Sequence, residues 1–394
     1  MHIGIGISTS RDHIQAAKEA ASKARLSLGK EKIDLVFVFS TVDFAHPIVL
    51  KTIAGLLGEV RPVIGCSSLS ILSDKGILKY GLVVMLFSMS QDSYFNVACV
   101  RDISKKSATL AGAQLGEKLL YGCKGVRRTV SIVFSDGLLQ NGSELISGLQ
   151  EKLGRSFPLV GASASDNLAF EKTYIYFGEE ILSDAACGIL FGGKWSFGLG
   201  IQHGWKPLGK TRRVTKSSGN TVSEIDFAPA GKIYEEYFAK DITELKRDLR
   251  RIATLYPVGI KIPGEKEYLL RNVIAIEGQT LIFQGDVPQG STIRLMIGTR
   301  ESCLQAAAQA AEDVKKNLAG HAIKFALLFD SATRSIIFGR QAPKELDTIK
   351  QKLGKNIPVV GIYTYAEQAP LSAINYLGKT YFHSHTITIL GVGE

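Results

Sequence analysis

Three short segments of similar sequence constrain the fold of this chain most strongly. Residues 62–68, 158–163 and 358–364 each begin with proline, continue with two aliphatic residues and a glycine, and end in a hydroxyl group. Proline suits the first residue of a buried strand, and a glycine near its end lets a second backbone or a ligand approach closely. The repetition predicts three equivalent strands that carry small polar groups to three equivalent places.

Each of these segments closes a similar succession of predicted strands and helices. The expected order is strand, helix, strand, helix, and then the proline-glycine element followed by a further strand. Strands are expected at 3–8, 35–39 and 81–87 in the first copy, at 95–100, 130–134 and 187–191 in the second, and at 292–297, 325–329 and 385–390 in the third. Apolar residues at consecutive strand positions are typical of α/β sheets that helices cover on both faces. The predicted fold is therefore α/β, with repeated β-α-β-α-β units in mixed sheets flanked by helices, in two domains. Two arrangements stay open: one continuous sheet, or two sheets stacked between helices in α/β/β/α layers.

A segment of different character separates the second and third copies. Residues 194–290 show short β-branched runs, a turn at 217–220 and two short helical patterns, one of them very rich in charge. We expect a first domain at 1–205 with two α/β units. A second domain at 206–394 would contain an insert at 206–289 and the third unit.

Composition narrows the class of protein. The 394 residues carry a net charge of +10, and five cysteines lie far apart without CxxC spacing, so a disulfide framework and a zinc cluster are not favoured. No apolar run reaches the ~18 residues of a membrane span, and the N-terminus lacks a secretion signal. A cytoplasmic protein is expected, with no cofactor. Nucleic-acid binding is not favoured, because aromatic residues do not interleave with the basic run at 206–216.

Three sequence features suggest phosphate binding, metal binding or catalysis without sufficient support. Residues 204–211 match the phosphate-binding pattern GxxxxGK[ST], but the β-branched sequence that follows predicts no helix to present its N–H groups to a phosphate. His383 and His385 could share a metal only with a third ligand that the sequence does not identify, so no metal site is assigned. Cys66 follows a strand-end glycine and is a candidate nucleophile, although a small buried cysteine is the commoner case.

Two arginines are candidates for holding a ligand carboxylate. Arg271 ends a predicted strand, and Arg334 follows the buried strand 325–329. A guanidinium at such a strand end can bind a carboxylate with two parallel hydrogen bonds, at the edge where ligands of α/β sheets gather. A structural ion pair with Asp330 or Glu367 is the alternative for either arginine.

Several motifs, taken in order, resemble the FIST family, whose proteins combine an N-terminal and a C-terminal FIST domain. The resemblance spans nearly the whole chain and rests on residues 160–167, 204–209, 267–271 and 383–386. This chain departs from the family pattern at Ser331, Ala366 and Ser384, where cysteine, glycine and asparagine are expected. The resemblance implies a sensory module that binds small ligands, amino acids being the usual suggestion.

Together these observations predict a ligand site formed by the strand tips and the arginines. The predicted ligand-binding residues are Cys66, Ser67, Ser163, Ser165, Asp166, Asn167, Arg271, Arg334, Tyr363 and Glu367. The favoured function is a small-molecule sensor that signals to a protein partner, without catalytic residues. A hydrolase that uses Cys66 or the Ser163/Ser165 cluster is one alternative, and a protein-interaction scaffold is another. The ligand, the partner and the oligomeric state stay open at this point.

Overall fold

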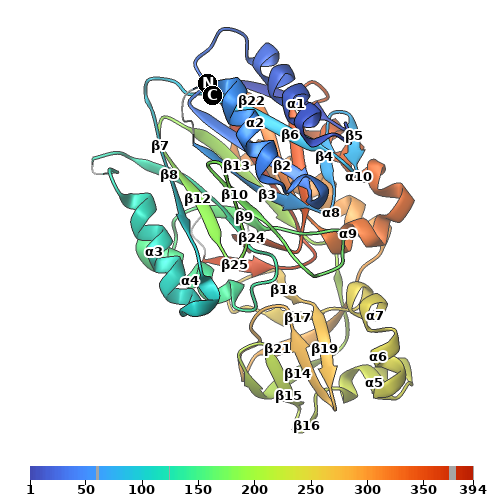
Figure 1. The fold of residues 1–394 in the computed structure, drawn as a ribbon. Coiled ribbons are helices and arrows are strands. Elements are labelled where there is room, and N and C mark those ends of the chain that lie inside the picture. The colour runs from blue at the N-terminus through green and yellow to red at the C-terminus, as the bar shows by residue number, and fades with distance from the viewer. Residues whose placement is uncertain (59–61, 124, 372–378, 394) are drawn as a thin grey trace.

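A computed structural model describes residues 1–58, 62–123, 125–371 and 379–393. Three six-stranded sheets form the body of the molecule, and a smaller domain projects from it at the bottom of Figure 1. Each large sheet combines a parallel strand pair with antiparallel neighbours, so the expected mixed α/β fold is confirmed. Among the described residues, no helix combines the length and apolar character needed to cross a bilayer.

The first sheet has the strand order β1-β6-β2-β3-β10-β11. Its unit supplies β1 (His2–Ser8), α1 (His13–Leu28), β2 (Leu35–Thr41), α2 (Pro47–Leu57), β3 (Val63–Ser68) and β6 (Leu82–Ser88). The last two strands, β10 (Ile175–Phe177) and β11 (Glu180–Leu182), come from the second unit. The sheet is therefore completed by a hairpin that another part of the chain donates.

The other two sheets repeat this order with different donors. The second unit contains β7 (Ser93–Val100), α3 (Ala108–Leu120), β8 (Arg128–Ser135), α4 (Gly142–Leu153), β9 (Leu159–Ser163) and β12 (Ala186–Gly193), and its sheet ends with β24 (Ala366–Pro370) and β25 (Thr380–His383). The third contains β13 (Ser196–Gln202), α8 (Arg300–Asn317), β22 (Ile323–Ser331), α9 (Ala332–Phe338), α10 (Ala342–Leu353), β23 (Val359–Thr364) and β26 (Ile387–Gly393), and its sheet ends with β4 (Ile71–Ser73) and β5 (Gly76–Leu78). Each unit thus gives one hairpin away and receives one, in a closed cycle.

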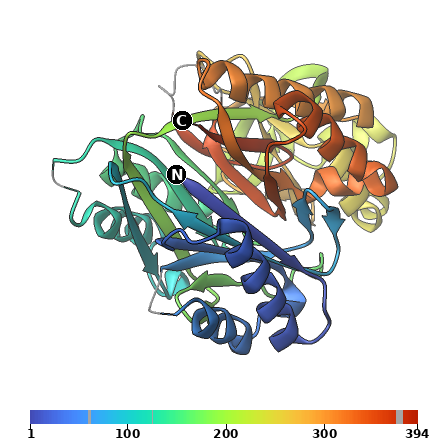
Figure 2. The same ribbon diagram turned by 90° about the horizontal axis from the view of Figure 1, so that it is seen from above.

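One face of every sheet points to a shared central core. Phe134 of the second sheet contacts Phe39 of the first sheet at 5.4 Å and Phe329 of the third at 6.0 Å between ring centroids. The outer faces are covered by α1 and α2, by α3 and α4, and by α8 and α10. Viewed from above, the helices lie outside and the strands inside (Figure 2). The layering α/β/β/α describes any two of the sheets, and the third closes the arrangement around a common centre.

The smaller domain interrupts the third unit between its first strand and first helix. It contains β14 (Lys206–Ser218), β15 (Thr221–Ile225), β16 (Ala228–Pro229), α5 (Lys232–Phe238), α6 (Ile242–Arg247), α7 (Leu249–Leu255), β17 (Val258–Lys261), β18 (Tyr268–Arg271), β19 (Val273–Glu277), β20 (Thr280–Phe283) and β21 (Thr292–Ile297). Its strands form one sheet in the order β18-β17-β21-β14-β15-β20-β19, with β16 beside β15. We call this part, residues 206–297, the inserted domain.

The assignment of strand 292–297 to the third repeat unit was wrong. That strand, β21, pairs with β14 and β17 inside the inserted domain, and β13 takes the first position of the third unit. Glycines show the equivalence of β13 and β1: a Cβ at Gly6 would lie 1.9 Å from the carbonyl oxygen of Ala20, and one at Gly200 would lie 1.8 Å from that of Ala310. Both first strands therefore need glycine where an alanine-rich helix packs directly on the sheet.

Candidate functional site

The three proline-glycine elements form β3, β9 and β23, and their ends meet at the centre of the molecule. The Ser67 hydroxyl donates to the Ser165 carbonyl oxygen at 2.9 Å, and the Ser165 N–H donates to the Ser67 carbonyl oxygen at 3.1 Å. The Ser165 hydroxyl also donates to the carbonyl oxygen of Tyr363. The structure therefore brings together the tips that the sequence identified. We call the contacts among Ser67, Ser165 and Tyr363 the central hub.

The hydroxyl groups at the hub are bonded within the protein. The Ser163 and Ser135 hydroxyls lie 2.9 Å apart, and the Gln368 amide donates to both. All of these side chains are buried. The direct hydrogen bonds hold the three sheets together, and a ligand role for Ser67, Ser163, Ser165 or Tyr363 stays a prediction.

Cys66 lies in β3 with no exposed surface. Burial raises the pKa of its thiol well above the ordinary value, because the thiolate would have to form without water. A thiolate nucleophile needs the opposite environment, with a nearby cation and access to solvent. The surroundings of Cys66 are thus those of a small core residue.

Arg334 holds buried elements of the third unit together. Its Nε lies 3.1 Å from Asp330 and 3.0 Å from Glu345, while its two terminal nitrogens donate to the carbonyl oxygens of His203 at 2.6 Å and Cys303 at 2.9 Å. All three charged side chains are fully buried, and burial raises the pKa of both carboxyl groups. These contacts correspond to the structural ion pair that the sequence left as the alternative for Arg334.

Arg271 and Glu367 are also buried, but their surroundings differ. The Arg271 guanidinium donates to the carbonyl oxygens of Asp286, Leu270 and Phe382, and no ion pair joins it to a carboxylate in the described part of the chain. Burial lowers the pKa of Arg271 to about 10. Glu367 accepts hydrogen bonds from Thr364 and Thr386, and burial raises its pKa to about 7.

Asp166 and Asn167 lie in a loop between the body of the molecule and the inserted domain. The Asp166 carboxylate accepts from the N–H groups of residues 170–172 and from the Tyr365 hydroxyl. Phe170 in this loop stacks on Tyr365, with 4.4 Å between the ring centroids. The guanidinium of Arg250 in α7 lies 5.7 Å from the centroid of the Phe170 ring. Asn167 is exposed. This loop therefore connects the second unit, the third unit and the inserted domain.

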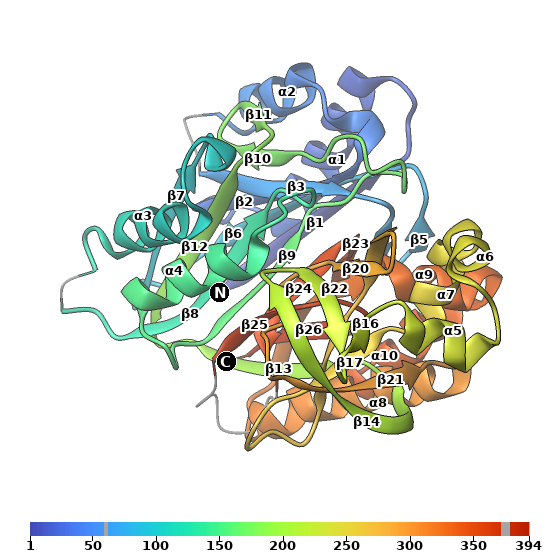
Figure 3. The same cartoon turned by 90° about the horizontal axis from the view of Figure 1, so that it is seen from below.

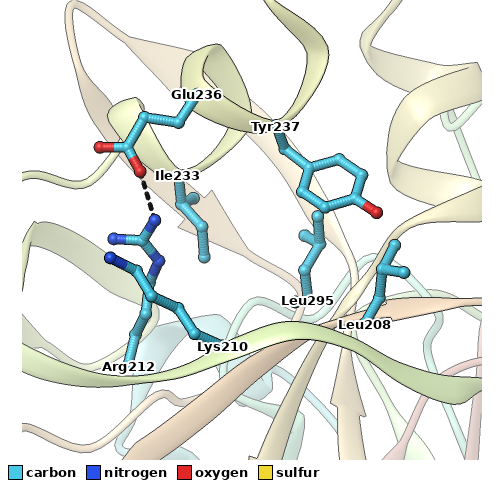
Figure 4. A pocket seen from close by; sticks show the side chains of 8 residues that line it. Leu208, Lys210, Arg212, Ile233, Glu236, Tyr237 and Leu295 are labelled. Carbon is cyan, nitrogen blue, oxygen red and sulfur yellow. Dashed lines mark hydrogen bonds and ion pairs between the residues drawn. The ribbon is translucent and has the colours of Figure 1, made fainter.

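A pocket of about 220 Å³ lies on the inserted domain between β14 and α5. Lys210 and Arg212 extend from β14 towards α5, where Glu236 forms an ion pair with Arg212 (Figure 4). Lys210 makes no hydrogen bond or ion pair within the described residues. Three aliphatic side chains, Leu208, Ile233 and Leu295, and the ring of Tyr237 complete the lining. We call this the β14/α5 pocket.

The β14/α5 pocket combines three kinds of group that a small zwitterion requires. Lys210 and Arg212 offer positive charge to a carboxylate, Glu236 offers negative charge to an ammonium group, and the aliphatic residues contact an apolar side chain. The Arg212 side chain is only 15% exposed, and its guanidinium pairs with Asp226 at 3.4 Å as well as with Glu236. Lys210 is therefore the cation of the pocket that has no carboxylate partner within the described residues.

Sequence reasoning did not identify this pocket, although it noted the basic run and the resemblance to a phosphate loop. Lys210 and Thr211 lie inside the long strand β14 rather than at the start of a helix. The phosphate-loop interpretation is therefore excluded on geometric grounds, as the β-branched sequence had indicated. The sequence does show two cations, Lys210 and Arg212, spaced two residues apart in the basic run. It does not show that Glu236 and Leu295, which are distant in the sequence, lie beside them.

The fold is that of an α/β protein with three interlocked units and an inserted domain. The model of the FIST N domain matches residues 34–227, and that of the FIST C domain matches residues 230–370. The chain belongs to the FIST family, whose domains are sensory domains in signal transduction. The predicted resemblance is confirmed.

Two similar proteins are described as uncharacterized. An uncharacterized protein of Methanocaldococcus jannaschii is 28% identical over 253 residues, which cover 59% of this chain and 48% of that protein, so the match spans about half of its length. An uncharacterized protein of Mycobacterium tuberculosis is 23% identical over 386 residues, which cover 96% of this chain and 97% of that protein. Among solved structures, PurLQS from Thermotoga maritima aligns with a TM-score of 0.23 at 12% identity, over 99% of this chain and 72% of that one.

Proposed function

We propose that this chain is a cytoplasmic sensory module that binds a small carboxylate, in the simplest case an amino acid, in the β14/α5 pocket and signals to a protein partner. Lys210 carries this proposal, because its side chain has no partner among the described residues and lies beside the Arg212–Glu236 ion pair and three aliphatic side chains. A ligand carboxylate would pair with Lys210 and Arg212, while an ammonium group would pair with Glu236. The five cysteines are free and buried, which agrees with a reducing compartment.

The small volume of the pocket limits the ligand. Drug-sized ligands occupy sites of about 300–1,000 Å³, so about 220 Å³ favours a smaller molecule. Leu208, Ile233 and Leu295 favour an aliphatic side chain over a second charge. We therefore expect an aliphatic amino acid to bind better than aspartate or glutamate.

A thermal-shift screen of amino acids and small carboxylates tests the proposal on the full chain. A ligand that binds only the folded protein raises Tm by mass action. The best amino acid is then compared with the same acid lacking its amino group. We expect the amino acid to bind about tenfold more tightly to the natural protein, because a charge-assisted hydrogen bond to Glu236 contributes about 1.5–3 kcal/mol.

Three variants connect a hit to this pocket. Lys210→Gln is expected to weaken both compounds, and Glu236→Gln is expected to remove the preference for the amino acid. Lys216→Gln removes the same charge from the same strand outside the pocket and serves as the matched control. The proposal fails if no compound stabilises the protein, or if Lys210→Gln and Lys216→Gln affect binding equally.

A further inference from the structure

A second pocket, of about 500 Å³, lies where the inserted domain meets the body of the molecule. The end of α6 and the helix α7 form one side, while α9 and the first residue of α8 form the other. Figures 1 and 3 both show α7 beside α9. We call this the junction pocket. It shares no lining residue with the β14/α5 pocket.

Positive charge is concentrated in the junction pocket. Arg247, Arg250, Arg251 and Arg300 line it, against the single carboxylate of Asp248. Asp248 pairs with Arg251 at 3.1 Å, whereas the side chain of Arg247 makes no hydrogen bond or ion pair within the described residues. The pocket therefore has three positive charges in excess.

The position of Arg300 increases this concentration. Arg300 is the first residue of the 18-residue helix α8, where the helix dipole favours an anion and disfavours a cation. Its Nε donates to the carbonyl oxygen of Ile337 in α9 at 2.7 Å, which holds the guanidinium at the pocket. Arginines that line one pocket repel one another, and an anion bound between them relieves this repulsion.

An apolar wall accompanies the four guanidinium groups. Leu255, Ile336 and Ile337 line the pocket, and Ile336 is 41% exposed. An exposed isoleucine beside several arginines suits a ligand that has a charged end and a less polar body. Inorganic ions alone would leave this wall uncovered.

We infer that the junction pocket binds an organic phosphate and thereby bridges the inserted domain to the third unit. Three excess charges match a group with two or more negative charges better than a single carboxylate. Guanidinium groups bind phosphate oxygens through two parallel hydrogen bonds. The organic part of the ligand would lie against Leu255 and Ile336. This inference does not depend on the β14/α5 pocket, and either can fail alone.

Inorganic pyrophosphate is the probe, with citrate as a polycarboxylate of comparable charge and sodium chloride at matched ionic strength. Thermal shift and calorimetry on the full chain should give a rise in Tm of about 2 °C or more at about ten times Kd. The double variant Arg247→Gln/Arg300→Gln should bind pyrophosphate at least about tenfold more weakly. Arg127→Gln/Arg155→Gln removes the same charge from exposed positions of the second unit and should bind within about twofold of the natural protein.

Three outcomes overturn the inference. The first is a pyrophosphate effect no larger than that of sodium chloride, since the pocket then holds no anion specifically. The second is equal weakening in the two double variants, because net charge rather than the pocket would explain binding. The third is citrate binding as tightly as pyrophosphate, which would assign the pocket to carboxylates. Each variant is compared with its own unliganded Tm, so a change in stability alone does not mimic a loss of binding.

Discussion

Glu367 offers a direct test of how burial controls charge near the central hub. Its carboxyl group has no exposed surface, and burial raises its pKa from 4.5 to about 7 even though Thr364 and Thr386 donate hydrogen bonds to it. The folded protein therefore takes up a proton at neutral pH that the unfolded chain does not. Replacing the group by the neutral amide in Glu367→Gln should remove this dependence.

The sign and size of this pH dependence follow from the difference between the pKa of Glu367 in the folded protein and its pKa in the unfolded chain. A group whose pKa is raised on folding stabilises the protein most below its unfolded value, and that stability is lost as the pH rises to the folded value. A rise from 4.5 to about 7 corresponds to about 3 kcal/mol, at about 1.4 kcal/mol for each tenfold change in proton affinity. Most of that loss, about 2–3 kcal/mol, falls between about pH 5 and pH 8.

Urea denaturation of the natural protein and of Glu367→Gln at pH 5 and pH 8 measures this effect. We expect the free energy of unfolding of the variant, relative to the natural protein, to rise by about 2–3 kcal/mol over that range. Glu277→Gln, at an exposed position on the inserted domain, is the control and should show no such change. Parallel pH profiles for the natural protein and Glu367→Gln would refute the reasoning, because Glu367 would then ionise as easily in the folded protein as in the unfolded chain.

Two further substitutions test the buried framework by urea denaturation. Arg334→Met should lower the free energy of unfolding by about 3–5 kcal/mol, because it leaves two buried carboxyl groups without their cation. The control Arg340→Met, at an exposed position, should change it by less than about 0.5 kcal/mol. Equal effects of the two substitutions would contradict a structural role for Arg334. Gly161→Ala should lower the free energy of unfolding by about 1–3 kcal/mol, since the new Cβ would lie 2.0 Å from the Val133 carbonyl oxygen. The control Gly55→Ala has open space around it and should be neutral or slightly stabilising. If Gly161→Ala left the stability unchanged, β8 and β9 could separate at this position.

The repeated elements could be predicted from the sequence because their pattern is local. Pro62, Pro158 and Pro358 each precede a buried strand, and the glycine three residues later is required by the adjacent parallel strand. The exchange of hairpins between units could not be predicted in the same way. The strand pattern of β4 and β5 is the same whether they pair with their own sheet or with the third, so only tertiary contacts decide the partner.

The error at β21 has a different cause. The insertion separates β13 from α8, so the last strand before the helix was taken as the first strand of the unit. The pair Gly198 and Gly200 held the correct information, because it repeats Gly4 and Gly6 of β1. Their close contact with the following helix shows why glycine is needed at these positions.

For the candidate sites too, the sequence shows individual charged residues but not the distant residues that surround them. Arg334 was singled out from its place after a strand, but its partner Glu345 comes from α10 and its acceptor His203 from the end of β13. Lys210 was visible in a basic run, yet the residues that make a pocket around it come from α5 and β21. A single sequence shows which charged residues could bind a ligand. Whether such a residue already has a partner within the protein depends on elements that are distant in the sequence.

The arrangement of the units indicates where binding can alter the molecule. The three units share strands in a closed cycle, so separating any two of them would break a sheet as well as the hydrogen bonds of the central hub. The inserted domain shares no strand with these sheets. Polar contacts such as Arg271 to the Phe382 carbonyl oxygen and Gln284 to the Tyr365 carbonyl oxygen join it to the body of the molecule.

Moving the inserted domain would therefore leave the three large sheets intact, whereas moving any of the three units would break a sheet. A ligand changes an equilibrium only by its different affinity for the two states. The β14/α5 pocket lies within this domain, and the junction pocket lies between it and the third unit. The aromatic residues between the pockets provide a physical connection. Tyr237 lines the β14/α5 pocket, and its ring lies 6.3 Å from that of Tyr256, which follows the last residue of α7 at the junction pocket. An occupant of the β14/α5 pocket would therefore contact Tyr237, whose ring packs against the residue that follows Leu255 of the junction pocket.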